Sequence, residues 1–251
     1  MRSAGRSAAT FVLTLAVVIG LPAAVAAQGT GDGFLFGTPK ATLSVQVGYA
    51  DAGAESELFN FVTEQLTLDR GDFAGLTAAS TVGIGLTPRL DLTLSAGYAG
   101  SESSSEFRDW VDLDDRSIEQ RTRFYRVPIV AGARLYVLPR GRTISPLAWI
   151  PAAYAPYVGV GGGMVWYRFH QSGDFVDFET LDVFADELKS SGWAPAAQFL
   201  AGLDVSVHPR VALTGEARYL RASAKLDGDF QGFDPIDLSD LSATAGISVR
   251  F

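Results

Sequence analysis

Apolar side chains recur at every second position along most of eight separate stretches of this chain, and only the fifth, which is rich in glycine, leaves the facing of its side chains open. In the last stretch, Leu241, Ala243, Ala245, Ile247 and Val249 alternate with small or polar residues. A repeat of two residues is typical of a β-strand whose two faces meet different surroundings. The stretches lie at about 42–49, 74–86, 90–98, 119–137, 157–170, 197–207, 211–219 and 241–251. The sequence therefore predicts an all-β fold with eight strands.

The connections between these stretches alternate between long and short. Long polar segments lie at 51–73, 101–118, 171–192 and 221–240, whereas the turns at 87–89 and 208–210 are very short. Transmembrane barrels show this alternation because their periplasmic turns are short and their external loops are long. The segment 138–156 departs from it, and its four prolines predict a longer, stiffer periplasmic connection. The spacing predicts an antiparallel up-and-down transmembrane β-barrel of eight strands with four long external loops.

Charge separates the two ends of the expected barrel and restricts its partners. Of the 28 acidic residues, 23 fall in the four long segments, so the two ends face different environments. The formal net charge of −8 argues against nucleic acid as a partner. The chain has no cysteine, which excludes disulfides and thiolate metal sites.

The N-terminus has the organisation of a secretory signal peptide. Arg2 and Arg6 precede an apolar stretch at 8–21, and small residues follow at 23–27. We expect cleavage after Ala27, because the apolar stretch is shorter than the roughly 20 residues of a spanning helix. The predicted organisation is a signal peptide at 1–27, a short N-terminal periplasmic segment at 28–39 and the barrel domain at 40–251.

Alternation alone does not say which face of the strands points outward. Aromatic residues near the strand ends predict two interfacial girdles, although core aromatics would give a similar pattern. One girdle would contain Tyr49, Tyr98, Tyr125, Tyr167, Trp193 and Tyr219, and the other Tyr136, Trp149, Tyr157 and Phe251. The opposite faces carry charges that would suit a narrow lumen filled by side chains. We expect a paired lumen network of Arg126, Arg134, Asp204, Glu216 and Arg218, in which Asp204 and Glu216 approach Arg218 and Arg134 reaches across.

The C-terminal run from Ala243 to Phe251 resembles the signal by which the outer-membrane assembly machinery recognises its substrates. In this reading, Ile247, Val249 and Phe251 form the assembly signal. The runs at 215–219 and 156–161 are similar to strands of the OmpA, OmpW and OmpX group of small outer-membrane barrels. The resemblance implies the bacterial outer membrane as the location, and the assembly machinery, outer-membrane lipid and lipopolysaccharide as partners. It implies no particular activity.

Three local features lead to further expectations. Pro128 lies inside the fourth stretch, where it cannot donate a ladder hydrogen bond, so we expect a bulge there. The glycines at 159–163 lie within a strand and favour bending over phosphate binding. The segment from Glu179 to Lys189 has apolar residues on one face and could form a short helix.

Few residues could carry chemistry. His170-Gln171-Ser172 resembles the His-x-Ser pair of lipid A deacylases, which would make His170 a general base, with Asp174 or Asp177 to orient it. Gly173 stands where that family has asparagine, and an ordinary strand-end histidine is the alternative that we favour. The acidic groups at 112–115 and 227–229 lack a full set of calcium-ligand spacings, so we expect solvated charge, with a loop-wide attraction for divalent cations as the alternative. No cofactor or fixed metal site is expected.

The leading hypothesis is a non-enzymatic outer-membrane barrel whose loops serve envelope integrity, adhesion or surface recognition. A conduit for small hydrophobic or amphipathic molecules is the second hypothesis, and a continuous cavity past the lumen charges would support it. A lipid A deacylase is the third.

Overall fold

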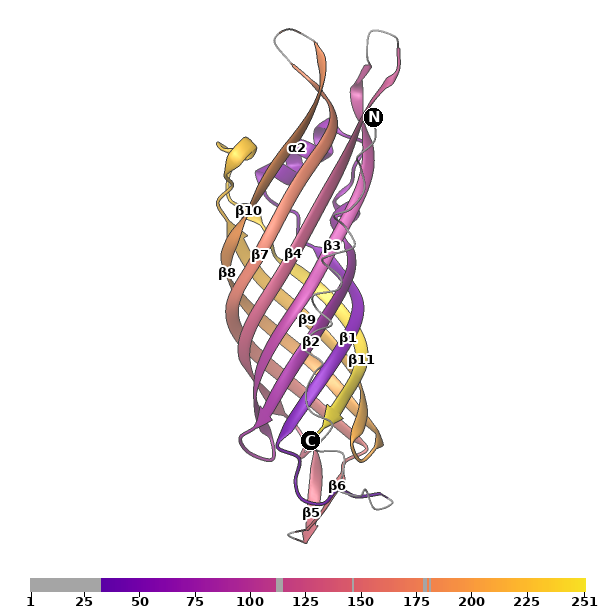
Figure 1. The fold of residues 1–251 in the computed structure, drawn as a ribbon, viewed down its shortest axis with the longest axis vertical. Coiled ribbons are helices and arrows are strands. Elements are labelled where there is room, and N and C mark those ends of the chain that lie inside the picture. Colours follow the sequence, from indigo (N-terminus) through magenta and orange to yellow (C-terminus); the bar gives the residue numbers. More distant parts are fainter. Residues whose placement is uncertain (1–32, 112–114, 146, 178–179, 181) are drawn as a thin grey trace, which may run out of the picture.

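The computed structural model describes residues 33–111, 115–145, 147–177, 180 and 182–251, so the predicted signal peptide lies outside the described residues. Eight antiparallel strands form a closed barrel, because β8 pairs with β9 as well as with β7 (Figure 1). The barrel strands in chain order are β1 (Ala41–Ala52), β2 (Gly75–Gly85), β3 (Leu90–Val111), β4 (Ser117–Tyr136), β7 (Tyr154–Val176), β8 (Val183–His208), β9 (Val211–Ala224) and β11 (Asp240–Arg250). The expected fold class is confirmed.

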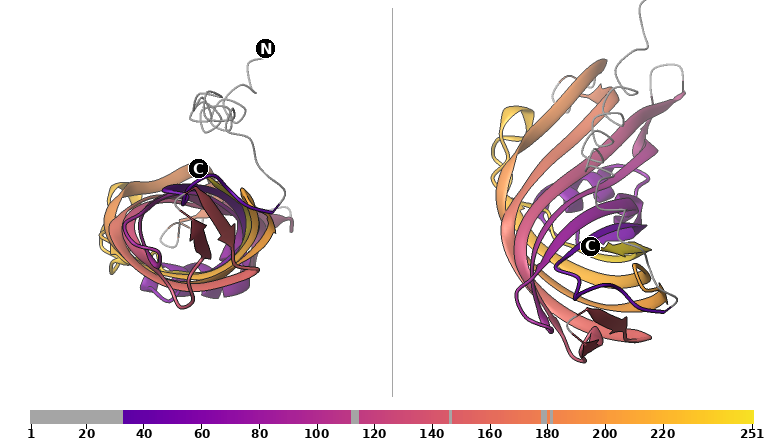
Figure 2. Two further views of the ribbon diagram at one scale, coloured as in Figure 1. Left: turned by 90° about the horizontal axis from the view of Figure 1, so that it is seen from below. Right: turned by 60° about the horizontal axis from the view of Figure 1, so that its bottom comes forward.

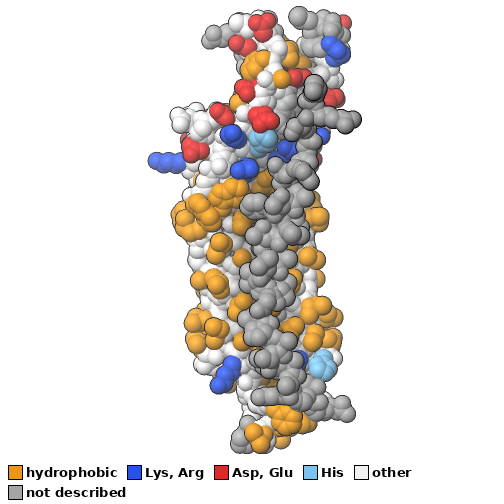
Figure 3. Space-filling view, viewed as in Figure 1, with side chains coloured by type: hydrophobic (Ala, Val, Ile, Leu, Met, Phe, Trp, Pro, Cys, Tyr) orange, Lys and Arg blue, Asp and Glu red, His pale blue; other side chains and the backbone are white. Residues whose placement is uncertain are grey.

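The outer surface of the barrel is apolar and its interior is polar, the reverse of a soluble protein. Figure 3 shows a band of hydrophobic side chains around the middle of the molecule, with charged residues above and below. On β1, for example, Val45 and Val47 are 51% and 64% exposed, whereas Ser44 and Gln46 are buried. A closed barrel leaves no unpaired strand edge in the membrane, and an apolar outer band faces lipid.

The strands differ greatly in length, and the four long ones are consecutive around the barrel. Strands β3, β4, β7 and β8 have 22, 20, 23 and 26 residues, whereas β1, β2, β9 and β11 have 12, 11, 14 and 11. The long strands continue past the barrel as a tall external sheet (Figures 1 and 2). Much of the segments 101–118 and 171–192, which we expected as loops, is therefore strand. The helix expected up to Lys189 is also wrong, because β8 begins at Val183.

The segment between β1 and β2 folds back over the external mouth instead of forming an open loop. It contains the helix α2 (Glu57–Gln65) and the 3-10 helix η3 (Arg70–Phe73). The apolar face of α2 is fully buried, and the ring of Phe59 packs edge-on against Phe73, Phe124 and Phe169 at 4.7, 5.3 and 5.8 Å between ring centroids. We call this segment, residues 53–74, the external plug. No helix in the described part of the chain is long and apolar enough to cross a membrane.

The last external connection also packs against the barrel mouth. It contains the 3-10 helix η4 (Gly228–Phe230) and β10 (Ile236–Asp237), which adds to β9. Phe230 and Ile236 are buried in the same apolar cluster as Phe59. The external end of the lumen is therefore closed by apolar side chains from two connections.

The connection at the periplasmic end, which we expected to be longer and stiffer than the other turns, contains a small hairpin. The hairpin consists of β5 (Gly141–Ser145) and β6 (Ala148–Pro151), and it crosses the barrel mouth when the molecule is seen from below (Figure 2). Trp149 of β6 pairs with Leu35 through two backbone hydrogen bonds and is 4% exposed. The Arg250 guanidinium lies 5.8 Å from the centroid of the Trp149 ring.

Pro128 is accommodated without the expected bulge. The pairings Ala96 with Ile129 and Ala99 with Arg126 share one register, so the ladder between β3 and β4 is interrupted but not shifted. A side chain at Gly97 would meet the Pro128 ring at 3.3 Å. The absence of a side chain at Gly97 therefore gives the proline ring room within a regular strand.

Candidate functional site

The centre of the lumen is an ion network around Glu216. Alternation along β4 and β9 turns Arg134, Glu216 and Arg218 inward from two different walls. The Arg134 Nη2 atom lies 3.3 Å from Glu216 Oε2, and Arg218 Nε donates to Glu216 Oε1 at 3.1 Å. Tyr157 donates its hydroxyl hydrogen to Glu216 at 3.0 Å, and the Arg134 guanidinium lies 4.3 Å from the Tyr157 ring centroid. These side chains are buried, so the charges compensate one another away from water.

Asp204 lies in the same region but has a different partner from the expected Arg218. Its carboxylate accepts a hydrogen bond from the Tyr136 hydroxyl at 3.2 Å. The Tyr136 and Tyr157 rings pack edge to face with centroids 5.5 Å apart. Tyr136, Tyr157 and Tyr167 are each 1% exposed inside the barrel, so their assignment to the girdles is wrong. Their even or odd position in the strand decides their facing, and their closeness to a strand end does not.

Arg126 forms a separate pair nearer the external end. Its Nη1 atom lies 3.1 Å from Asp240 Oδ2 and donates to the Ser239 carbonyl at 3.2 Å. Its guanidinium also lies 4.9 Å from the Phe124 ring centroid, so the pair lies against the apolar cluster below the plug. The expected network of five residues is thus two groups, one around Glu216 and one at Arg126.

Sequence reasoning missed several lumen charges. Arg140 donates to Asp91 at 2.9 Å close to the periplasmic end, and both side chains are buried. Asp240 also faces inward, and so does Arg250, which alternation places on the polar face of the last stretch. The same alternation along β3 and β11 could have added Asp91 and Asp240 to the expected network. Arg140 lies beyond β4 and has no such signal.

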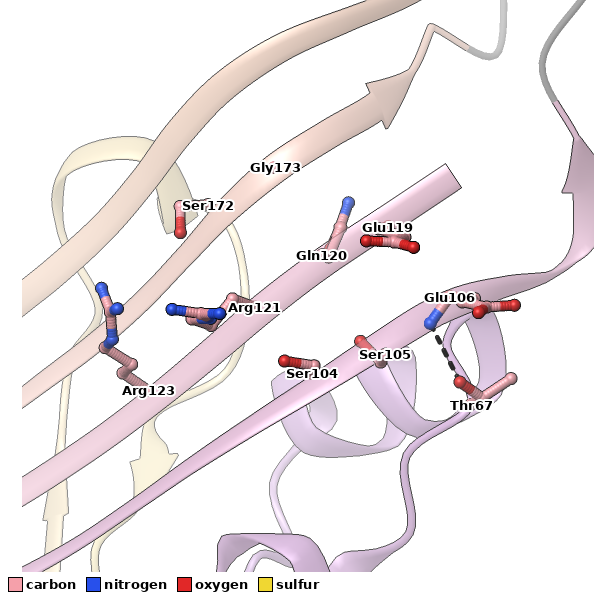
Figure 4. Close-up of a pocket in the computed structure, with 10 residues that line it drawn as sticks. All are labelled: Thr67, Ser104, Ser105, Glu106, Glu119, Gln120, Arg121, Arg123, Ser172 and Gly173. Carbon is pink, nitrogen blue, oxygen red and sulfur yellow. Dashed lines mark hydrogen bonds between the residues drawn. The ribbon is translucent and has the colours of Figure 1, made fainter. Parts of the chain in front are cut away.

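Buried side chains therefore lie in the lumen at its external end, in its middle and near its periplasmic end. Apolar groups fill the external end, ion pairs and tyrosines the middle, and the β5–β6 hairpin the periplasmic end. One polar cavity of about 490 Å³ lies in the external sheet, where Figure 4 shows Arg121 and Arg123 of β4 beside Ser104 of β3 and Ser172 of β7. A second cavity, of about 770 Å³, is lined by the external ends of β1, β9 and β11.

The residues proposed for chemistry have ordinary structural partners. The His170 Nε2 atom lies 3.8 Å from the Glu187 carboxylate on the neighbouring strand β8. Asp227 accepts a hydrogen bond from the Ser190 hydroxyl, and Asp229 accepts one from the Lys189 backbone N–H at 2.9 Å. The described residues contain no cluster of three or more metal-binding side chains, and the acidic residues at 112–114 lie outside them.

The predicted assembly signal forms the end of the last strand. Ile247 and Phe251 are about half exposed on the outer face, and Val249 is partly buried between them. The Phe251 backbone N–H donates to the Ala41 carbonyl at 2.9 Å, so the final residue is tied to the first strand. Recognition by the assembly machinery stays a prediction.

The closed barrel, its apolar outer band and its charged, filled interior define a small eight-stranded β-barrel protein of the bacterial outer membrane. No protein-family model and no curated protein matches the chain.

Among solved structures, Neisserial surface protein A (NspA) is 16% identical over 84% of this chain and 97% of that chain, with a TM-score of 0.45. OprG from Pseudomonas aeruginosa is 15% identical over 86% and 99%, with a TM-score of 0.46. The outer membrane protease OmpT from Escherichia coli is 12% identical over 90% and 100%, with a TM-score of 0.36. Each is a similarity of fold alone.

Proposed function

We propose that this protein is a non-enzymatic outer-membrane barrel with a closed lumen whose external sheet recognises other surfaces. The observation that carries the proposal is the contrast between a lumen filled by buried side chains and four strands that extend far beyond the barrel. Strand β3 continues for 13 residues beyond Tyr98, up to Val111, which at about 3.4 Å per residue is roughly 44 Å along the strand. Such an extension contributes nothing to spanning the membrane.

The external sheet has the features of a display surface. Every residue of β8 from Val183 to Lys189 except Leu188 is exposed. The rings of Phe175 and Phe184 lie 6.2 Å apart near the tip of the β7–β8 hairpin, and Phe184 is 45% exposed. The plug supports β3, which forms the other edge of the external sheet, because Thr67 accepts a hydrogen bond from the Glu106 backbone N–H at 2.9 Å (Figure 4). Aromatic side chains on a braced sheet support a role in contact with other surfaces.

Shortening one hairpin tests this function. Replacing residues 175–184 by Asn-Gly joins the paired residues Asp174 and Ala185 through a two-residue turn that suits a hairpin. We expect a host strain with the shortened barrel to adhere less to epithelial cells and matrix-coated surfaces than a strain with the full barrel. Equal surface amount and heat-modifiable mobility in gels control for folding. Unchanged adhesion of the shortened strain, or no adhesion conferred by the full barrel, would contradict the proposal.

The deacylase alternative is tested separately. His170 contacts Glu187, and an enzyme would lose lipid A deacylation in His170→Ala. We expect identical lipid A profiles in mass spectra of cells that express the wild type, His170→Ala or no protein. A deacylated species that depends on His170 would replace the proposed function by an enzymatic one.

A further inference from the structure

A group of cations lies on the outer face of the barrel just above the membrane-facing band. We call it the rim cluster and define it as Arg123 on β4, Arg168 and His170 on β7, and Lys189 on β8. The strand register places Arg123, His170 and Lys189 side by side in one row. Arg168 lies in the row below, between Tyr125 and Ser191. Figure 3 shows blue and pale-blue side chains gathered at this height, directly above the hydrophobic band.

The rim cluster has a fixed height relative to the membrane. The row beneath Arg168 pairs Trp166 with Trp193, and Trp193 is 56% exposed on the outer face. The next exposed residue down β7 is Met164, which belongs to the apolar band. Aromatic girdles mark the level of the lipid headgroups in outer-membrane barrels. The cluster is therefore level with the headgroups of the outer leaflet.

The cations are incompletely neutralised by the protein. Glu102 lies 3.1 Å from Arg123 and 3.3 Å from Arg121, and Glu187 lies 3.8 Å from His170. Within the described residues, the side-chain nitrogens of Arg168 and Lys189 form no ion pair with a carboxylate, whereas Asp229 accepts a hydrogen bond from the Lys189 backbone N–H at 2.9 Å. The Arg168 guanidinium lies over the Trp166 ring at 5.4 Å from its centroid. Both side chains are exposed and available to a ligand.

Geometry brings these charges close together. Arg168 is the diagonal neighbour of Arg123 on one side and of Lys189 on the other, and diagonal neighbours in a sheet are about 7–8 Å apart. Like charges at such distances repel, whereas one anion between them would interact with several donors at once. Acidic residues such as Glu119 and Asp174 lie farther out on the same sheet and would repel an anion there. A negatively charged group is therefore favoured at the rim cluster over these acidic positions.

We propose that the rim cluster binds the phosphate groups of a phosphorylated glycolipid of the outer leaflet, of the lipid A class. Arg168 and Lys189 contribute the donors that the protein leaves unpaired, and Trp166 and Trp193 pack against the lipid beneath the phosphate. The site lies on the lipid-facing wall, so it is independent of what the tip of the external sheet recognises.

The test compares lipid binding by the intact protein and by a double variant. Protein purified in detergent from outer membranes is titrated with bis-phosphorylated lipid A, with chemically dephosphorylated lipid A and with inorganic phosphate, and native mass spectrometry gives the bound fraction. We expect the wild type to prefer the phosphorylated lipid at least tenfold. Arg168→Gln/Lys189→Gln should weaken that binding by about tenfold for each lost charge-assisted contact. Binding of the dephosphorylated lipid should not change.

The matched control is Arg89→Gln/Arg142→Gln, which removes two exposed cations at the periplasmic end and should bind like the wild type. Equal binding of both lipids by the wild type, or full binding by a folded rim variant, overturns the proposal. Tight binding of inorganic phosphate would indicate a free-anion site in place of a lipid site. If the rim variant does not fold, the proposal is tested by the wild type alone, through the ratio of its binding to phosphorylated and dephosphorylated lipid A.

Discussion

Glu216 joins two arginines that approach from different directions inside the barrel. Replacing it by glutamine keeps the shape but leaves Arg134 and Arg218 without their buried counter-charge. We expect Glu216→Gln to lower the free energy of unfolding by about 3–5 kcal/mol, the range for breaking a buried pair. Urea-induced unfolding of the barrel from lipid vesicles measures this. Glu64→Gln, an exposed change on α2, is the control and should be nearly neutral.

Glu102 gives a prediction about pH at the external sheet. The Arg123 hydrogen bond lowers the pKa of the Glu102 carboxyl below its ordinary value of 4.5. A lowered folded-state pKa contributes stability that is fully present above the unfolded-state pKa and is lost as the pH falls through the folded-state pKa. Carboxyl NMR titration should show the pKa of Glu102 rising toward its ordinary value in Arg123→Gln but not in Arg89→Gln. An unchanged Glu102 pKa in Arg123→Gln would mean that the contact does not form.

At the scale of residues, alternation predicted which charges face inward but not how they pair. Arg134 and Glu216 belong to β4 and β9, which are not neighbours, so their contact depends on the stagger of the whole barrel. That stagger has no local signal in the sequence. Tyr136 and Tyr157 could have been assigned correctly, because each occupies an inward position of its strand.

Introducing a charged side chain tests which residues of a strand face lipid. Val47 is 64% exposed in the middle of the apolar band on β1. We expect Val47→Arg to destabilise the barrel by about 2–4 kcal/mol, the cost of a cation near the bilayer midplane. The control is Val183→Arg. Val183 is 37% exposed on the external part of β8, so this change should lower the free energy of unfolding by roughly 0.5 kcal/mol or less. Equal costs in vesicle unfolding experiments would place Val47 outside the membrane.

The external plug depends on one face of α2. Phe59→Ala removes a fully buried ring that contacts three other rings, so we expect a loss of about 3–5 kcal/mol. Phe61 on the same helix is 42% exposed and packs against Phe233 alone among the ring contacts of the described residues, so Phe61→Ala should cost about 1 kcal/mol or less. Similar losses for both variants would show that α2 is not docked in the mouth.

At the scale of elements, the membrane-spanning parts were predictable and the external parts were not. In the membrane, lipid outside and polar groups inside impose alternation on every strand. Beyond the membrane, β3 has no lipid-facing side and its inner face meets polar groups of the plug, so Ser101 to Ser105 look like a loop although they form a strand. The plug was missed because its apolar residues are few and are buried only by the barrel mouth.

The molecule as a whole should conduct ions poorly. Its lumen is closed by the external plug, the ion network and the periplasmic hairpin. In planar bilayers we expect no large, steady single-channel currents, whereas a 16-stranded porin in the same bilayer should give them because its wider barrel leaves an aqueous channel. Steady currents from the folded wild type would contradict the filled lumen and would support the conduit hypothesis.

The four long strands are consecutive around the barrel, and this gives the protein a front and a back in the plane of the membrane. A neighbouring protein that approaches β9, β11 or β1 meets short strands, whereas one that approaches β4 or β7 meets the external sheet. The barrel can turn about the membrane normal, so contacts that fix this rotation also decide which way the external sheet faces. In a crowded membrane, the direction in which the sheet is presented to another cell would therefore be set by lateral neighbours as much as by the barrel itself.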